Sequence, residues 1–187
     1  MDEEIINKPK FNFSDFFKKN KFKIFSTIAL IIVTIFILII LNEYQKKRNI
    51  DISEKFNTAK ILIEKKNSGE ATQILEDIVL KKNTFYSPSA LNLIVDNNLI
   101  KDRTKVLSFF DHIISINKLD LETKNLFIFK KIIFIGDDIN ENELLSSLKP
   151  IMQSNSLWKN TVSNYIKKYY LSKGELNKAK NFDISNN

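Results

Sequence analysis

Few side chains in this sequence are of the types that carry out acid–base, nucleophilic or metal chemistry. The 187 residues include one histidine, His112, and no cysteine. A cysteine nucleophile, a disulfide framework, a thiolate zinc site and a multi-histidine metal site are therefore excluded. His112 follows Asp111, but adjacent residues of a helix point about 100° apart, so they do not form a natural catalytic pair. We predict a non-enzymatic protein that uses no cofactor, metal or small-molecule substrate.

The basic charge of the chain is spread along its length. The formal net charge is +7, from 29 Lys+Arg and 22 Asp+Glu, and the two types of charge are interleaved. A nucleic-acid-binding protein more often gathers its basic residues on one face. We therefore predict no nucleic-acid partner.

An apolar run from Ile24 to Leu41 contains 18 residues without a charge, a glycine or a proline. As a helix it spans about 27 Å, close to the roughly 30 Å of a bilayer's hydrocarbon core. The sequence therefore predicts a transmembrane helix over residues 22–42, with the lipid bilayer as its partner. A buried core helix usually keeps some polar edge, and a cleaved signal peptide has a shorter apolar region followed by a small-residue cleavage pattern. The run fits neither alternative well.

Basic residues on the two sides of this run predict its orientation. Five lysines precede it closely and four basic residues follow it, namely Lys10, Lys18, Lys19, Lys21 and Lys23, then Lys46, Lys47, Arg48 and Lys55. The side with more positive charge tends to stay in the cytoplasm. This small excess favours a cytoplasmic N-terminal tail over residues 1–21 and a domain over 43–187 on the other side.

The sequence after the anchor has mostly helical periodicity. Apolar residues recur at i, i+3 and i+4 over 71–79, 106–114, 145–152 and 165–170, and Pro150 is expected to kink or end its helix. The segment 126–135 has strand propensity, but its length and its helical neighbours favour a buried helix. The predicted fold class is therefore all-α, with one N-terminal transmembrane helix followed by helical hairpins.

The predicted helix breaks recur at nearly regular spacing. They lie at Gly69, Asp102, Gly136 and Gly174, which are 33, 34 and 38 residues apart. The tetratricopeptide repeat has a period of 34 residues. Gly174 is followed five positions later by Ala179, so a turn glycine precedes a small residue on which the second helix can pack closely. We predict a degenerate tetratricopeptide-like array of three to four hairpins.

The last predicted hairpin offers two candidate binding residues. If it has the repeat geometry, Asn164 and Lys168 point into a concave groove, where an amide can bind a peptide backbone and a lysine can bind carboxylates. The alternative for both is a solvated helix face. Trp158 is expected to pack at the start of this hairpin, and Tyr170 is expected to lie in the core.

The order of these features resembles a known family. A short charged tail with the element FFKKNK at 16–21 precedes a single anchor, and a helical-repeat domain of about 150 residues follows. The domain closes with Leu157-Trp158 and with the segment YLSKG at 170–174. The last residue of this segment, Gly174, lies five positions before Ala179. Over nearly the whole chain, this order is similar to that of the bacterial tetratricopeptide-repeat-like ancillary subunits of the Sec translocon.

The resemblance implies a location and partners. Members of this family cross the inner membrane once, with the N-terminus in the cytoplasm and the repeat domain in the periplasm. They associate with Sec translocon subunits and with a membrane-anchored periplasmic chaperone, and they catalyse nothing. The expected function is therefore a protein-interaction module that assists export. The alternative is an assembly scaffold for another cell-envelope or division complex.

Overall fold

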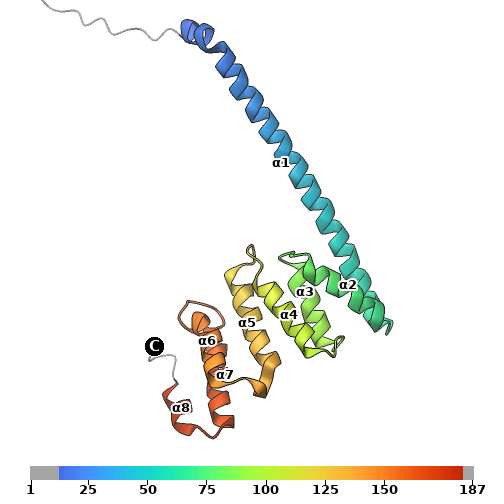
Figure 1. The fold of residues 1–187 in the computed structure, drawn as a ribbon, viewed down its shortest axis with the longest axis vertical. Coiled ribbons are helices and arrows are strands. Elements are labelled where there is room, and N and C mark those ends of the chain that lie inside the picture. The colour runs from blue at the N-terminus through green and yellow to red at the C-terminus, as the bar shows by residue number, and fades with distance from the viewer. Residues whose placement is uncertain (1–12, 183–187) are drawn as a thin grey trace, which may run out of the picture. The chain divides into compact units, whose positions relative to one another are not determined.

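The computed structural model describes residues 13–182, which form helices and no strand (Figure 1). The all-α prediction is confirmed for these residues. They fall into two units, one ending at Asp51 and one beginning at Ile52. Most of the predicted tail, residues 1–12, lies outside the described residues.

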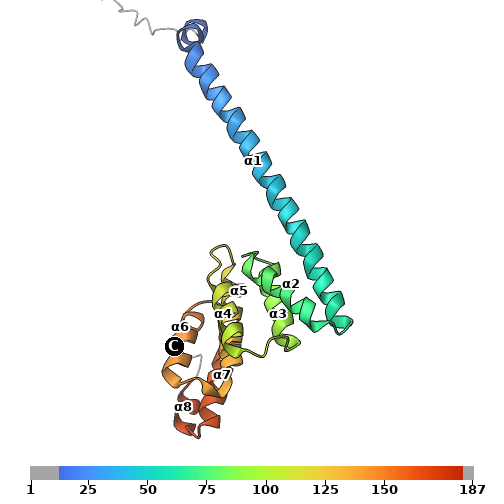
Figure 2. The same cartoon turned by 45° about the vertical axis from the view of Figure 1, so that its right-hand side comes forward.

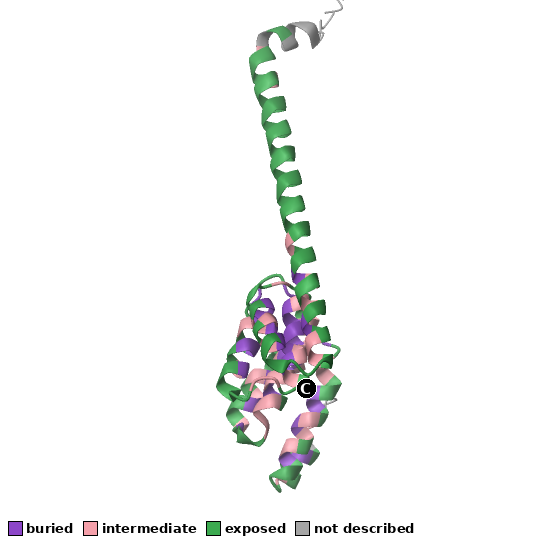
Figure 3. Ribbon diagram, turned by 90° about the vertical axis from the view of Figure 1, so that its right-hand side faces the viewer, coloured by how far each residue is buried: buried purple, intermediate pink, exposed green. Residues whose placement is uncertain are grey.

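The first unit consists of helix α1, which spans Phe13–Glu64 and continues past Asp51 into the second unit. Among the described residues, it is the one helix long and apolar enough to cross a membrane. The large apolar side chains between Phe25 and Leu41 are 46–68% exposed (Figure 3). Residues of these types usually lie in a core, so their exposure needs an explanation.

The two threonines inside the apolar run are satisfied by their own helix. The hydroxyl of Thr27 donates to the carbonyl of Lys23 at 2.9 Å, and that of Thr34 donates to the carbonyl of Leu30 at 2.8 Å. These i to i−4 hydrogen bonds satisfy both threonine hydroxyls without water.

The second unit begins with the last residues of α1 and continues through shorter helices joined by short loops (Figures 1 and 2). The elements are α2 (Ser68–Leu80), α3 (Tyr86–Asp96), α4 (Arg103–Ile114), α5 (Leu121–Ile135), the 3₁₀ turn η1 (Gly136–Asp138), α6 (Glu141–Met152), α7 (Lys159–Ser172) and α8 (Leu176–Asn181). The segment 126–135 is helical, as predicted, and α6 ends two residues after Pro150.

Short polar side chains cap the beginnings of several helices. The carboxylate of Asp102 accepts a hydrogen bond from the backbone N–H of Lys105 at 3.2 Å, and Asp120 accepts one from Thr123 at 2.9 Å. Hydrogen bonds from Thr123 also lower the pKa of Asp120, because they stabilise its charged form. The break predicted at Asp102 is thus a helix start, with Asp102 as its N-cap residue.

The glycines predicted as turn residues do not all lie in turns. Gly136 and Gly174 have φ angles of +66° and +76°, a conformation that L side chains rarely adopt, and both lie where a helix ends. Gly69 lies in the first turn of α2 instead. The left-handed residue of that turn is Lys66, with φ at +61°. The prediction of a turn at Gly69 is therefore wrong by three residues.

This difference predicts opposite effects of alanine at two glycines. Gly136→Ala should destabilise the protein by about 1–3 kcal/mol, because alanine is strained at positive φ. Gly69→Ala should stabilise it by about 0.4–1 kcal/mol, because its site is helical and open, with nothing within 4 Å of an added Cβ. Denaturant unfolding of the two variants in detergent measures both effects. Equal destabilisation would contradict this assignment of the turns.

Buried side chains of the second unit form two apolar clusters that meet along α5. The first extends from the end of α1 to α5 and contains Leu75, Leu91, Ile94, Phe110, Ile113 and Phe127. The second extends from α5 to α8 and contains Phe129, Ile132, Leu144, Leu148, Ile151 and Ile166. Because α5 supplies side chains to both clusters, its apolar residues do not follow a single stripe.

Two of the three most extensive helix pairs differ from the predicted hairpins, whereas α7 and α8 pair across Gly174 as predicted. α2 packs more extensively on α3 than α3 does on α4, and α4 packs more extensively on α5 than α5 does on α6. The ring of Phe110 on α4 contacts Phe127 and Phe134 on α5, with centroids 6.2 and 5.7 Å apart. These aromatic contacts join helices across the loop 115–120. The strongest pairs therefore do not straddle the breaks at Asp102 and Gly136.

Candidate functional site

A pocket among the described residues lies on the surface of α6 and α7. Its volume is about 580 Å³, and its apolar lining includes Leu145, Met152, Ile166 and Phe182. Ile166 is 1% exposed and belongs to the second core cluster, so it forms a fixed floor. The other three are half-buried and pack on that cluster. The pocket is thus a shallow extension of the core that opens to the outside.

Two lysines give this pocket its charge. Lys149 from α6 and Lys159 from α7 belong to the lining, and no acidic residue does. Neither lysine side chain forms a hydrogen bond or ion pair with another described residue. Polar Ser146 and Gln153 complete the lining. Apolar surface beside two available ammonium groups suits a ligand with an apolar group and a nearby carboxylate.

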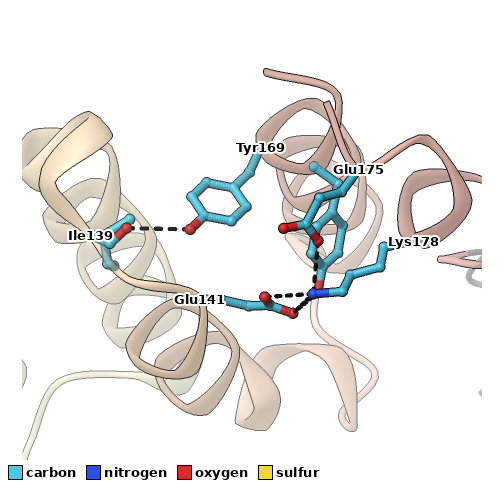
Figure 4. A network of polar contacts seen from close by, with 6 residues as sticks. Ile139, Glu141, Tyr169, Glu175 and Lys178 are labelled. Carbon is cyan, nitrogen blue, oxygen red and sulfur yellow. Dashed lines mark hydrogen bonds and ion pairs between the residues drawn. The ribbon is translucent and has the colours of Figure 1, made fainter. Parts of the chain in front are cut away.

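The wall formed by Phe182 depends on the position of α8. A polar network ties α8 to the beginning of α6 (Figure 4). Lys178 donates to both carboxylate oxygens of Glu141, at 2.8 and 2.7 Å, and pairs with Glu175 at 2.7 Å. The hydroxyl of Tyr170 donates to the same carboxylate at 3.0 Å, and its ring lies 6.1 Å from that of Phe182.

The network shifts the pKa of Glu141, Lys178 and Tyr170. Hydrogen bonds from Lys178 and Tyr170 lower the pKa of Glu141 below its usual 4.5. Hydrogen bonds to Glu141 and Glu175 raise the pKa of Lys178. Burial, and secondly the hydrogen bond to Glu141, raises the pKa of Tyr170 to about 12. The charged forms of Glu141 and Lys178 are therefore both favoured by folding.

We predict that Lys178→Met loosens α8. Amide hydrogen exchange in α8 should become about two- to fivefold faster, as expected for the loss of the exposed ion pairs of Lys178 with Glu141 and Glu175. The same loosening should appear in the native protein as pH falls through the lowered pKa of Glu141, because its contribution exists only above that range. It should also appear as pH rises through the raised pKa of Lys178, whose contribution exists only below it.

Lys180→Met is the matched control for this prediction, because Lys180 lies on the same helix and is exposed. Equal exchange rates in α8 for the two variants would show that the network does not hold this helix.

The candidate groove residues do not line the pocket. Asn164 and Lys168 are both exposed on α7, whereas the pocket takes Lys159 and Ile166 from that helix. Ala179 is 7% exposed and packs in the second core cluster. Tyr170 is 4% exposed, which confirms its predicted place in the core.

The structure does not pair the only histidine with its acidic neighbour. The carboxylate of Asp111 is bound by the ammonium group of Lys131, and Nε2 of His112 has no hydrogen-bond partner among the described residues. Over residues 13–182, no group of three or more His, Asp or Glu side chains is placed to hold a metal ion.

Trp158 joins the α6–α7 loop to the beginning of α5. Its indole N–H donates to the carbonyl of Glu122 at 3.1 Å. The carboxylate of Glu122 accepts from the hydroxyl of Ser156 at 2.8 Å and from the backbone N–H of Leu157 at 3.1 Å. The side chain of buried Asn125 donates to Ser156 at 3.1 Å. These contacts fix the loop from which Lys159 enters the pocket.

The pocket residues that sequence reasoning missed are Ser146, Lys149, Gln153, Lys159 and Phe182. Their spacing follows no motif, because the pocket forms only when α6, α7 and the residues after α8 come together. Comparison of the chain with protein-family models, curated proteins and solved structures gives no match.

Proposed function

We propose that this chain is a non-enzymatic, single-span membrane protein whose helical domain binds a partner protein through the pocket of α6 and α7. The observation that carries the binding proposal is the pair of unengaged lysines, Lys149 and Lys159, beside an apolar floor. The partner segment we expect carries a large apolar side chain and a carboxylate close to it.

The membrane part of the proposal rests on the exposed apolar run of α1. An 18-residue window of this helix has a mean hydropathy of 3.2 and is 0% buried. Such a surface is unfavourable in water by about 25 cal/mol for each Å² of apolar area. The hydrocarbon core of a bilayer removes this cost and matches the length of the run. Confinement in the membrane then raises the effective concentration of the domain near membrane partners.

We further propose a setting for this interaction, based on the resemblance in sequence order. The domain would lie in the periplasm of a bacterium, beside the Sec translocon and a membrane-anchored chaperone, and would assist protein export. The basic residues before the apolar run support an N-terminus in the cytoplasm.

Affinity purification of the tagged full-length protein from detergent-solubilised native membranes tests the proposal. Mass spectrometry should identify translocon subunits and a periplasmic chaperone, also when an unrelated span replaces residues 22–42. Recovery of the protein alone, or of division or envelope components, would overturn the export setting and favour the scaffold alternative.

The pocket can be tested in the same purification. Lys149→Glu together with Lys159→Glu should lower partner recovery about tenfold or more, because like charges placed opposite each other cost several kcal/mol. Lys60→Glu together with Lys180→Glu makes the same change in net charge at exposed positions outside the pocket. Partner recovery that falls equally in both double variants would contradict binding at the pocket.

A further inference from the structure

Three loops of the second unit lie at the same end of the helical array. They are 81–85 between α2 and α3, 115–120 between α4 and α5, and 153–158 between α6 and α7. Figures 1 and 2 show the first two loops side by side. The third contacts the beginning of α5, next to the second loop, through the hydrogen bond that Ser156 donates to Glu122. We call this surface the loop end.

The chain also enters the second unit at the loop end. The ring of Phe56 on α1 lies 5.6 Å from that of Tyr86, which is the first residue after the α2–α3 loop. Phe56 comes only four residues after Ile52, where the second unit begins. The opposite ends of α4 and α5 are held together by Arg103, whose guanidinium donates to the carbonyls of Phe134 and Ile135.

Each of the three loops exposes one large apolar side chain. Leu157 is 83% exposed, Phe85 is 66% exposed and Leu121, at the end of its loop, is 62% exposed. These are the three most exposed large apolar side chains described in the second unit, and all lie at the loop end. The next, Leu176 at 58%, lies beside the turn between α7 and α8 at the opposite end.

Lysines accompany these apolar side chains, while the nearby acids are engaged within the fold. Lys82 and Lys118 are exposed, and neither side chain forms a hydrogen bond or ion pair with a described residue. The carboxylate of Asp120 caps α5, and that of Glu122 accepts from Ser156 and Leu157. Apolar tips with free ammonium groups beside them are typical of surfaces that bind the interface of an anionic membrane.

The connection between the apolar run and the second unit is short. Ten residues, 42–51, separate the end of the apolar run from the second unit, and as a helix they cover about 15 Å. Lys46, Lys47 and Arg48 belong to this connection and suit the headgroup layer. Ile52 follows only four residues later, which is about 6 Å along a helix.

We propose that the loop end docks on the anionic lipid surface of the membrane that α1 crosses. Phe85, Leu121 and Leu157 enter the interface, and Lys82 and Lys118 contact the headgroups. This inference rests on the proposed membrane anchor. Docking of this end fixes the rotation of the domain above the membrane, which decides where a partner must approach the α6–α7 pocket.

Site-specific fluorescence tests this proposal without interference, because the chain has no cysteine of its own. Phe85→Cys, Leu121→Cys and Leu157→Cys each take one environment-sensitive label, and Leu176→Cys is the matched control. The full-length variants are reconstituted in liposomes with or without anionic lipid. Quenching is measured with a nitroxide on lipid headgroups and with iodide in the water.

The three loop labels should be quenched by the headgroup nitroxide in anionic liposomes, and the Leu176→Cys label should be quenched only by iodide. Adding Lys82→Gln and Lys118→Gln should shift the docked-to-undocked ratio about 25-fold toward water, at about fivefold for each lysine near the surface. Equal quenching of all four labels by iodide would overturn the docking proposal. This result counts only if the protein resists alkaline carbonate extraction, which shows that it is anchored in the membrane.

Two further outcomes separate this inference from the proposed function. Extraction of the protein by alkaline carbonate would overturn the membrane anchor itself. Protection of the loop labels in native membranes, but in no liposome, would show that a protein covers this end, and would overturn docking on lipid.

Discussion

Two lysines placed in the middle of the apolar run should release the protein from the membrane. Ile32→Lys and Phe36→Lys lie one helical turn apart within the 18-residue run. A lysine near the centre of a transmembrane helix costs about 2.5–3.5 kcal/mol, so the pair opposes insertion by about 6 kcal/mol. We expect the double variant in the soluble fraction after alkaline carbonate extraction, and the native chain in the membrane pellet.

Asn42→Lys together with Tyr44→Lys is the control for this prediction, since it adds the same two charges just beyond the run. This variant should stay in the membrane pellet. An N-terminal tag should also remain on the membrane-bound native chain, because a span that is not cleaved keeps its tail. Loss of the tag would identify a signal peptide, and retention of the Ile32→Lys, Phe36→Lys variant in the pellet would contradict the span.

Leu148→Ala should cause a large loss of stability, because it truncates a side chain of the second core cluster. Leu148 lies on α6 and is 0% exposed, among Leu144, Ile151 and Val162. Truncation of a fully buried leucine costs about 2–5 kcal/mol, since it removes apolar burial and leaves a cavity. Denaturant unfolding followed by circular dichroism in detergent measures this change in the free energy of unfolding.

Leu157→Ala makes the same chemical change at a side chain that is 83% exposed. Its effect should stay within about 0.5 kcal/mol, as for most surface substitutions. A loss at Leu148→Ala no greater than that at Leu157→Ala would show that the second cluster does not pack as described.

The helices of the second unit could be predicted from sequence because their apolar faces follow the helical period. Asp102 could also be recognised as a break, since an aspartate before a helix is a common N-cap. The turns were harder to place. Lys66, Lys82 and Asn98 adopt positive φ without a glycine. The left-handed conformation costs a lysine about 1–2 kcal/mol. The residue type of a lysine therefore does not indicate that it adopts this conformation.

The pairing of helices and the pocket depend on contacts that periodicity does not contain. α5 buries Phe127 in one cluster and Phe129 in the other, so no single stripe indicates its neighbours. The pocket needs Lys149, Lys159 and Phe182 from three separate segments. Phe182 reaches it because α8 packs on α7 and is tied back to α6 by an ion pair between residues 37 positions apart.

Photo-crosslinking from the pocket in native membranes tests the central claim most directly. The photoreactive amino acid p-benzoylphenylalanine replaces Met152, which lines the pocket, and in a second variant it replaces Leu171, an exposed α7 residue outside it. We predict a crosslink to another protein from position 152 that disappears when Lys149→Glu and Lys159→Glu are added. A product that persists with the reversed charges, or the same product from position 171, would contradict partner binding at this pocket.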